Sequence, residues 1–186
     1  MRLTEPRIAP LSDTEFTDEQ RELLKPFGGR VLNIFRTLVR EPKAFERFNQ
    51  WGGYILSRRN SLPAREREIV ILRTGFLCKS GYEWTQHVGI AKREGLNGEE
   101  IARIKKGAVA EWSEPDAALI RACDELHRDQ FITDATWKLL AAHFSEKQRM
   151  DLVFTVGQYT QVSMMLNSFG VQLEPEQTLD PDLRGF

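Results

Sequence analysis

The sequence has few cysteines and no long apolar run, and these two absences exclude several classes of protein. Its 186 residues include only two cysteines, Cys78 and Cys123. They form neither a disulfide framework nor a CxxC pair. No apolar run approaches the roughly 20 residues that a bilayer-spanning helix needs. The N-terminus also lacks the apolar centre of a signal peptide. We therefore expect a cytoplasmic protein with reduced thiols.

The sequence also lacks a strong charge of either sign. Its formal net charge is -1, so there is no overall electrostatic case for binding nucleic acid. It has no glycine-rich phosphate loop, low-complexity segment or clear internal repeat. It does have 41% hydrophobic and 28% charged residues, a balance that suits one globular domain with a real core.

The pattern of helix caps predicts an all-α fold of about eight helices. Capping boxes recur at Thr17–Gln20, Asn97–Glu100 and Ser145–Gln148, and no segment alternates convincingly with the period of two that strands show. The candidate helical segments are 17–25, 33–40, 44–57, 61–77, 80–94, 97–107, 113–130, 133–143 and 145–167.

The two ends of the chain lack helical periodicity. Residues 1–16 carry Pro6 and Pro10 and should form an extended arm, a kind of segment that often lies over a neighbouring subunit. Residues 17–173 should form the all-α domain. Residues 174–186, with two prolines and several acidic side chains, are expected to be a C-terminal tail.

The stretch from Arg65 to His87, REREIVILRTGFLCKSGYEWTQH, carries the candidate chemistry. An apolar run is followed directly by a cysteine, two aromatic residues, a glutamate and a histidine. Polar reactive groups beside a hydrophobic segment indicate a pocket more than a solvated surface. The middle of the helix at 61–77 is apolar on every side, so this helix should be central and buried.

Glu83, His87 and Glu68 are the candidate catalytic residues. Glu83 and His87 are four residues apart and share one face of a helix. A carboxylate beside an imidazole can orient a general base or relay a proton, and Glu68 on the preceding helix is a natural partner for His87. Structural roles for the three residues remain open. Glu83 could form a capping box with Ser80, and Glu68 could lie in a solvated first turn of its helix. His87 taken alone could be a core histidine whose hydrogen bonds are satisfied and which has no catalytic role.

The motifs in this stretch resemble a known family. RxREIVIL followed by CxSxYEWxxH is similar to the carboxymuconolactone decarboxylase family, which includes the alkylhydroperoxidase D-like proteins; the match is most specific over about 61–101. The alkylhydroperoxidase branch carries a glutamate followed by CxxCxxxH. Placing His87 on that histidine puts Glu68 on the glutamate, and Ser80 and Glu83 on the two cysteines. The dithiol of that branch is therefore missing here.

The resemblance implies an alkylhydroperoxidase D-like helical domain and a decarboxylase type of chemistry without a metal or organic cofactor. The substrate would be a small carboxylated lactone from the breakdown of aromatic compounds. His87 would supply or relay a proton, Glu68 would orient the imidazole, and Glu83 would be a second acid or base.

Substrate contacts are expected from residues around the catalytic ones. Tyr82 and Trp84 would shape the site, together with Cys78 and Ser80. An anionic substrate also needs a cation or N–H donors, which the helix N-terminus near Ser80 and the side chain of Arg73 would provide. We expect no metal site, because two glutamates and one histidine lack a further strong ligand.

Two other functions remain open. One is a thiol-dependent peroxidase with peroxiredoxin-like activity that uses Cys78, and the other is a non-catalytic binding protein on the same fold. The expected partner is a small-molecule substrate, without nucleic acid or membrane. The resemblance also implies a homotrimer, or a hexamer made of two trimers, with pockets near the subunit contacts.

Overall fold

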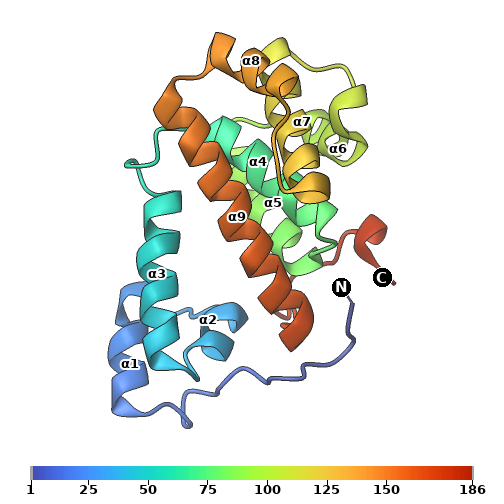
Figure 1. Cartoon of the computed structure of the whole chain (residues 1–186). Helices are drawn as coiled ribbons and strands as arrows, with labels where there is room; N and C mark the ends of the chain where they lie inside the picture. Colours follow the sequence, from blue (N-terminus) through green and yellow to red (C-terminus); the bar gives the residue numbers. More distant parts are fainter. Residues whose placement is uncertain (1, 186) are drawn as a thin grey trace.

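The computed structural model describes residues 2–185, and over this range the regular structure is entirely helical (Figure 1). The all-α prediction is confirmed, with nine α-helices and three short 3-10 helices in the described range. The elements are α1 Asp18–Leu24, η1 Lys25–Phe27, α2 Asn33–Leu38, α3 Pro42–Leu56, α4 Ala64–Leu77, α5 Gly81–Arg93, α6 Gly98–Lys106, η2 Gly107–Val109, α7 Glu114–Asp129, α8 Asp134–His143, α9 Glu146–Phe169 and η3 Pro181–Leu183.

Helix α4 is the centre of the fold. Every residue from Glu68 to Gly75 is buried, and the helix packs against α5, α7 and α9 on different sides. This burial follows from the run Ile69–Leu72, which leaves the helix no polar face to turn to solvent. No helix in the described range is long and apolar enough to cross a membrane.

Most predicted helix starts agree with the structure. Thr17, Asn97 and Ser145 each complete a reciprocal capping box with the glutamine or glutamate three residues later. The start of α4 differs from its prediction, because the helix begins at Ala64 after Pro63 and Ser61 does not cap it. The backbone N–H and the hydroxyl of Ser61 instead donate to Asp151 on α9.

The N-terminal arm packs on its own chain. The backbone N–H groups of Arg7 and Ile8 donate to the carbonyl of Phe169 at the end of α9, and Figure 1 shows the arm running beneath α2 and α9. Gly170 follows α9 with a φ of 70°. A side-chain carbon at this position would lie 2.9 Å from the Glu5 carbonyl oxygen, so glycine is needed both for the turn and for the close approach of the arm.

The C-terminal segment, which the sequence predicted to be a tail, also packs against the helices. Leu183 in η3 is fully buried in a cluster with side chains of α4, α5 and α6. Asp180 accepts hydrogen bonds from the Trp84 indole at 3.1 Å and from the Lys105 ammonium at 2.8 Å. Apolar burial and these polar contacts together hold the segment in place.

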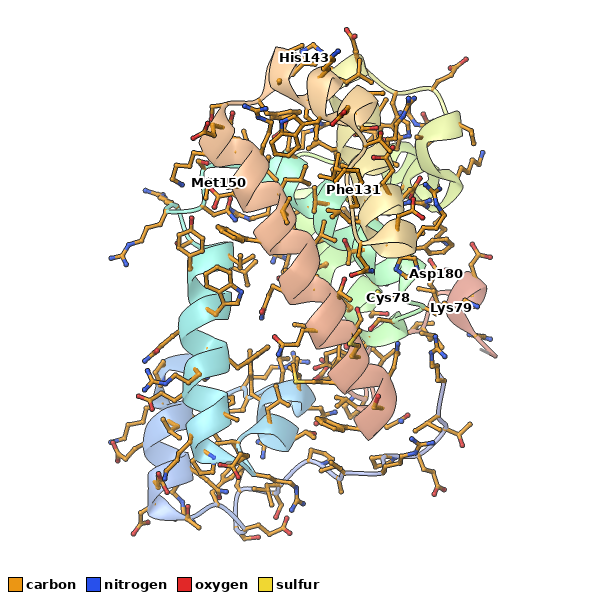
Figure 2. All side chains as sticks on the ribbon, viewed as in Figure 1. Cys78, Lys79, Phe131, His143, Met150 and Asp180 are labelled. Atoms are coloured by element: carbon orange, nitrogen blue, oxygen red, sulfur yellow. The ribbon has the colours of Figure 1, made fainter. Side chains whose placement is uncertain are left out.

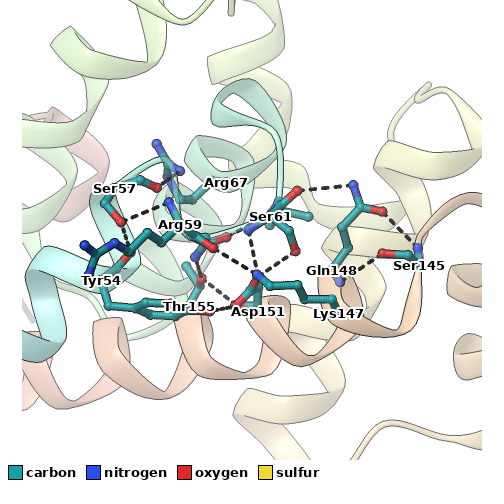
Figure 3. A network of polar contacts seen from close by, with 12 residues as sticks. Tyr54, Ser57, Arg59, Ser61, Arg67, Ser145, Lys147, Gln148, Asp151 and Thr155 are labelled. Carbon is teal, nitrogen blue, oxygen red and sulfur yellow. Dashed lines mark hydrogen bonds and ion pairs between the residues drawn. The ribbon is translucent and has the colours of Figure 1, made fainter.

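Asp151 ties α9 to α3 and to the loop before α4 (Figure 3). Its carboxylate accepts hydrogen bonds from the Tyr54 hydroxyl at 2.6 Å, from Ser61, and from the Lys147 ammonium at 2.9 Å. Burial alone would raise the pKa of Asp151, but the hydrogen bonds from Ser61 and Tyr54 outweigh burial and lower the pKa to about 2. The contribution of Asp151 to stability is therefore present above pH 3.8 and is lost as the pH falls through about 2.

We predict that Asp151→Ala lowers the free energy of unfolding by about 2–4 kcal/mol, since hydrogen bonds to a charged acceptor contribute roughly 1.5–3 kcal/mol each and are not additive. Urea denaturation followed by circular dichroism measures this loss. Asp134→Ala is the control, because Asp134 lies exposed at the start of α8 and its removal should change stability by less than about 1 kcal/mol. Equal losses in the two variants would contradict the structural role of Asp151.

Candidate active site

His87 lies between two carboxylates deep in the protein. Its Nδ1 is 2.8 Å from Glu68 Oε2, and its Nε2 is 3.0 Å from Glu83 Oε1. The exposed fractions of Glu68, Glu83 and His87 are 0%, 4% and 6%. Helix α5 places Glu83 and His87 on one face through their spacing of four residues, and α4 presents Glu68 to the other ring nitrogen.

The geometry excludes two of the structural roles that the sequence left open, the capping box of Glu83 and the solvated first turn of Glu68. Ser80 is the N-cap of α5 but makes no side-chain capping bond, so Glu83 does not form the capping box and bonds to His87 instead. Glu68 is fully buried and does not belong to a solvated first turn. A side-chain carbon added at Gly75 would lie 3.3 Å from Glu83 Cγ, so glycine lets α4 approach α5 closely at this point.

The two carboxylates control the charge of His87. Burial alone would lower the pKa of His87, but the negative charge of Glu83 and the hydrogen bonds to Glu68 and Glu83 outweigh burial and raise the pKa to about 10. At neutral pH the imidazole is therefore protonated, and both N–H groups donate to carboxylates. The second oxygen of Glu68 is buried without a hydrogen-bond partner, which is unfavourable for a buried polar atom.

A cavity of about 320 Å³ opens beside this group, between α2, α3, α5 and α9. Its lining is mostly aromatic and aliphatic and includes no lysine or arginine among the described residues. The polar part of the lining consists of Glu83 and His87 together with Asn49, Tyr82, Gln86, Gln158 and Tyr159. The Tyr159 ring stands perpendicular to the His87 ring with 5.0 Å between the centroids. This is the size and character of a small-molecule site.

The glycine pair in α3 also belongs to this cavity. Gly52 and Gly53 both line it, and a side-chain carbon at Gly53 would meet no atom within 4 Å. The absent side chain at Gly53 leaves open space beside the cavity, which larger residues would partly fill.

Glu174 is a site residue that the sequence reasoning missed. Its carboxylate accepts hydrogen bonds from the Tyr82 hydroxyl at 2.8 Å, from Gln86 Nε2 at 2.5 Å and from the backbone N–H of Asn33 at 2.9 Å. Tyr82 and Gln86 line the cavity, and Asn33 begins α2, which has no side-chain cap of its own. Burial and the charge of Glu174 raise the pKa of Tyr82. Glu174 therefore holds in place both the start of α2 and the side chains of α5 that line the cavity.

Three of the four residues predicted to contact substrate do not line this cavity. Trp84 points to the other side of α5, where it packs on Phe76 and donates to Asp180. Ser80 is fully buried, and its hydroxyl has no hydrogen-bond partner. Cys78 lines a separate surface pocket, and its sulfur lies 3.8 Å from His127 Nδ1. Tyr82 is the one of the four that reaches the cavity.

Arg73 and the second cysteine are also placed away from the cavity. Arg73 donates to Asp124 at 2.6 Å and to the carbonyl of Ile104, so it joins helices rather than holding a substrate. Cys123 is fully buried under Val70, and burial raises its pKa to about 12. Burial also raises the pKa of Cys78. Both cysteines are free thiols, and the described residues contain no cluster suited to a metal ion.

Comparison with known proteins supports the family resemblance. Residues 42–122 match the carboxymuconolactone decarboxylase family, which confirms the likeness seen in the motifs. No curated protein matches the sequence.

Several solved structures share the fold over nearly the whole chain. An alkylhydroperoxidase AhpD core protein, an uncharacterized peroxidase-related protein from Ralstonia eutropha JMP134, superimposes with a TM-score of 0.77 at 18% identity, covering 91% of this chain and 94% of its own. The debrominase Bmp8 in complex with 2,3,4-tribromopyrrole gives 0.75 at 12% identity, with coverage of 92% and 94%. A peroxidase-related protein from Silicibacter sp. TM1040 gives 0.74 at 16%, with 94% and 92%. At these identities the likeness shows the fold.

We predict that His87 titrates near pH 10, well above its ordinary value of 6.5, because protonation is favoured by both carboxylates. Its imidazole signals in an NMR titration report the midpoint. Glu83→Gln should lower the midpoint, since it removes one of the two charges. A midpoint below pH 7 in the wild type would contradict the two-sided arrangement.

The same shift has a consequence for stability. Because the pKa of His87 is raised in the folded state, the stabilisation is complete below about pH 6.5 and is lost as the pH rises through about 10. The free energy of unfolding should therefore fall over this window in the wild type, and His87→Gln should weaken that dependence. Denaturant titrations at several pH values measure both.

Proposed function

With residues 42–122 matching the carboxymuconolactone decarboxylase family, we propose that this chain is an acid/base enzyme that transfers a proton to or from a small molecule in the cavity. The observation that carries the proposal is the buried imidazole of His87 between Glu68 and Glu83, at the edge of a mostly apolar cavity. Ionisable groups with strongly shifted pKa values in a cavity are typical of catalytic sites.

Each of the three groups has a separate task in the proposed step. Glu83 lines the cavity, and its carboxylate takes the proton from the bound molecule. The imidazolium of His87 stabilises the negative charge that develops on that molecule, and a proton returns from Glu83 to the product. Glu68 holds Nδ1 of His87 and keeps the ring in the orientation that points Nε2 at Glu83.

Decarboxylation is one reaction that these groups would support. After carbon dioxide leaves a carboxylated lactone, the remaining enolate needs a proton on carbon, which Glu83 and His87 can deliver. The charge of the cavity favours this substrate less than the sequence suggested. Arg73 is paired with Asp124, away from the cavity. The cation that lines the cavity, His87, is already bonded to two carboxylates. We therefore place the proposal at the level of proton transfer and include the carboxylated lactone among the compounds to test.

The geometry favours a thiol peroxidase less than it favours an acid/base enzyme. Cys78 lies outside the cavity, and burial raises the pKa of its thiol, which lowers the fraction of reactive thiolate. After peroxide oxidises a thiol to a sulfenic acid, a reductant must restore the thiol, and this reductant is either a second cysteine of the chain or an external thiol. Cys123, the other cysteine of the sequence, is buried against Val70.

A homo-oligomer remains part of the proposal. The outward face of α9 carries exposed apolar side chains at Met150, Val153, Phe154 and Met164, and Figure 2 labels Met150 on this helix. Trp51 on α3 packs against Phe154 with 5.4 Å between ring centroids and extends the same surface. An exposed apolar patch of this kind is typical of a subunit contact.

The proposal predicts catalysed exchange of hydrogen at carbon. The assay incubates the protein in D₂O with a carboxylated five-membered lactone, its uncharged analogue and 2-tetralone, and NMR follows deuterium incorporation and carbon dioxide release. We expect His87→Ala and Glu83→Gln to lower the rate by about 10²–10⁴-fold, the usual contribution of a positioned acid or base.

Two control variants separate the alternatives. His143→Ala removes an imidazole at the far end of α8, and Cys78→Ser removes the thiol; both should stay within about twofold of wild type. Loss of activity in Cys78→Ser would support thiol chemistry instead. Rates at the buffer level with every compound, or equal rates in wild type and His87→Ala, would contradict the acid/base function.

A further inference from the structure

A second cavity lies next to the first cavity, the one that opens beside His87. It has a volume of about 260 Å³ and is bordered by the N-terminal arm, α2, the start of α3 and the end of α9. Its lining is mostly apolar and includes Ile8, Leu38, Phe45, Met165 and Phe169. A cavity of this character suits an alkyl group more than a polar one.

The two cavities follow one another along the space between α3 and α9. The first cavity is lined by residues within 49–56 of α3 and 158–162 of α9. The second is lined by residues within 44–45 of α3 and 165–169 of α9. Figure 1 shows α2 between the lower parts of these two helices. The path from the first cavity to the second runs toward the start of α3 and toward the end of α9, so the second cavity continues the first along one antiparallel helix pair.

Phe48 stands at the boundary between the two cavities. It is the one described residue that lines both of them. Its half-buried side chain packs into an apolar cluster together with Val162 from the first cavity and Met165 from the second. A ring at this position closes a passage that a smaller side chain would leave open, because replacing a large side chain by a small one leaves unfilled volume.

The first cavity alone accommodates a compact molecule. An engineered protein cavity of roughly 150 Å³ holds benzene, and the first cavity measures about 320 Å³. Phe27 and Phe35 line it as well as Phe48, and aromatic walls of this kind suit a ring. A linear chain attached to that ring would lie either in the second cavity, past Phe48, or in water. It gains hydrophobic stabilisation only in the second cavity.

We propose that Phe48 determines the specificity of the site by limiting the length of the substrate. The substrate is then a compact, substituted ring that ends at Phe48, and removal of the Phe48 ring joins the two cavities and admits a linear alkyl chain. The inference rests on the proposed acid/base function, since it concerns the molecule that meets Glu83 and His87, but the binding itself needs no reaction.

A series of 4-alkylcyclohexanones measures this limit. These ketones are neutral, carry acidic C–H groups beside the carbonyl and differ only in the length of the alkyl chain. Isothermal titration calorimetry at pH 7 gives the affinities of the 4-propyl and 4-heptyl compounds. Each methylene that becomes buried strengthens binding about fourfold. In the wild type the extra methylenes stay in water, so the 4-heptyl compound should bind no more than about threefold more tightly than the 4-propyl compound.

Phe48→Ala should open the passage. In this variant we expect the 4-heptyl compound to bind at least tenfold more tightly than the 4-propyl compound. Phe27→Ala is the matched control, because Phe27 is also a half-buried phenylalanine that lines the first cavity and does not line the second. It should keep the wild-type ratio. If Phe48→Ala loses the folded His87 signal in the NMR spectrum, Phe48→Leu takes its place and should give a ratio of at least sixfold.

The methyl group of Met165 reports where the alkyl chain lies. Met165 lines the second cavity and does not line the first, and Met150, exposed on the same helix, lines neither. In protein with ¹³C-methyl-labelled methionine, the Met165 signal should shift when the 4-heptyl compound binds to Phe48→Ala. It should keep its position when the compound binds to the wild type or to Phe27→Ala, and the Met150 signal should stay unchanged in all three proteins.

The outcomes separate this inference from the acid/base function. A wild-type ratio of tenfold or more, equal ratios in Phe48→Ala and Phe27→Ala, or no binding of either ketone to the wild type and Phe48→Ala would overturn the role of Phe48. Deuterium exchange that depends on Glu83 and His87, together with such a result, would leave the acid/base function in place. A length limit that depends on Phe48, without exchange in any compound, would support this inference and contradict the acid/base function.

Discussion

The structure of the site depends on one constraint, which is that both nitrogens of a buried imidazole are bonded to carboxylates from two different helices. Such a group is stable only if the helices keep it dry and hold the partners at hydrogen-bond distance, since a buried charge that loses its partner is strongly unfavourable. Helix α4 meets this need through its all-round burial, and Gly75 allows α5 to come near enough for Glu83 and His87 to meet Glu68. The central position of α4 and the chemistry of the site therefore have the same cause.

The sequence predicted those parts of the structure that depend on neighbouring residues. The capping boxes at Thr17, Asn97 and Ser145 located three helices, and the spacing of Glu83 and His87 placed them on one face, because helix geometry is local. The role of Glu68 needed a contact between two helices, which the sequence allowed but local helix geometry could not establish, and which the family resemblance favoured. The orientation of a side chain around its helix was the weak point: Trp84 was expected in the site and faces the opposite way.

The residues that the sequence did not reveal come from distant parts of the chain. Gln158 and Tyr159 lie in the middle of α9, where nothing in the local pattern separates a cavity-lining glutamine from a solvated one. Glu174 lies in a segment whose prolines and acidic residues resemble a solvated tail, yet its carboxylate is buried. Their roles arise from tertiary packing. Hydrophobic periodicity and helix-capping patterns are local and carry no information about such packing.

The position of Glu174 has a consequence for how the protein is made. The N-terminus of α2 and two side chains of α5 all donate to this one carboxylate, which follows both helices in the chain. During synthesis the ribosome releases α2 and α5 long before it releases Glu174, so these groups first meet water or other donors and acceptors. The cavity can take its final shape only after Glu174 has emerged from the ribosome, later than α2 and α5, which makes completion of the site a late event in folding.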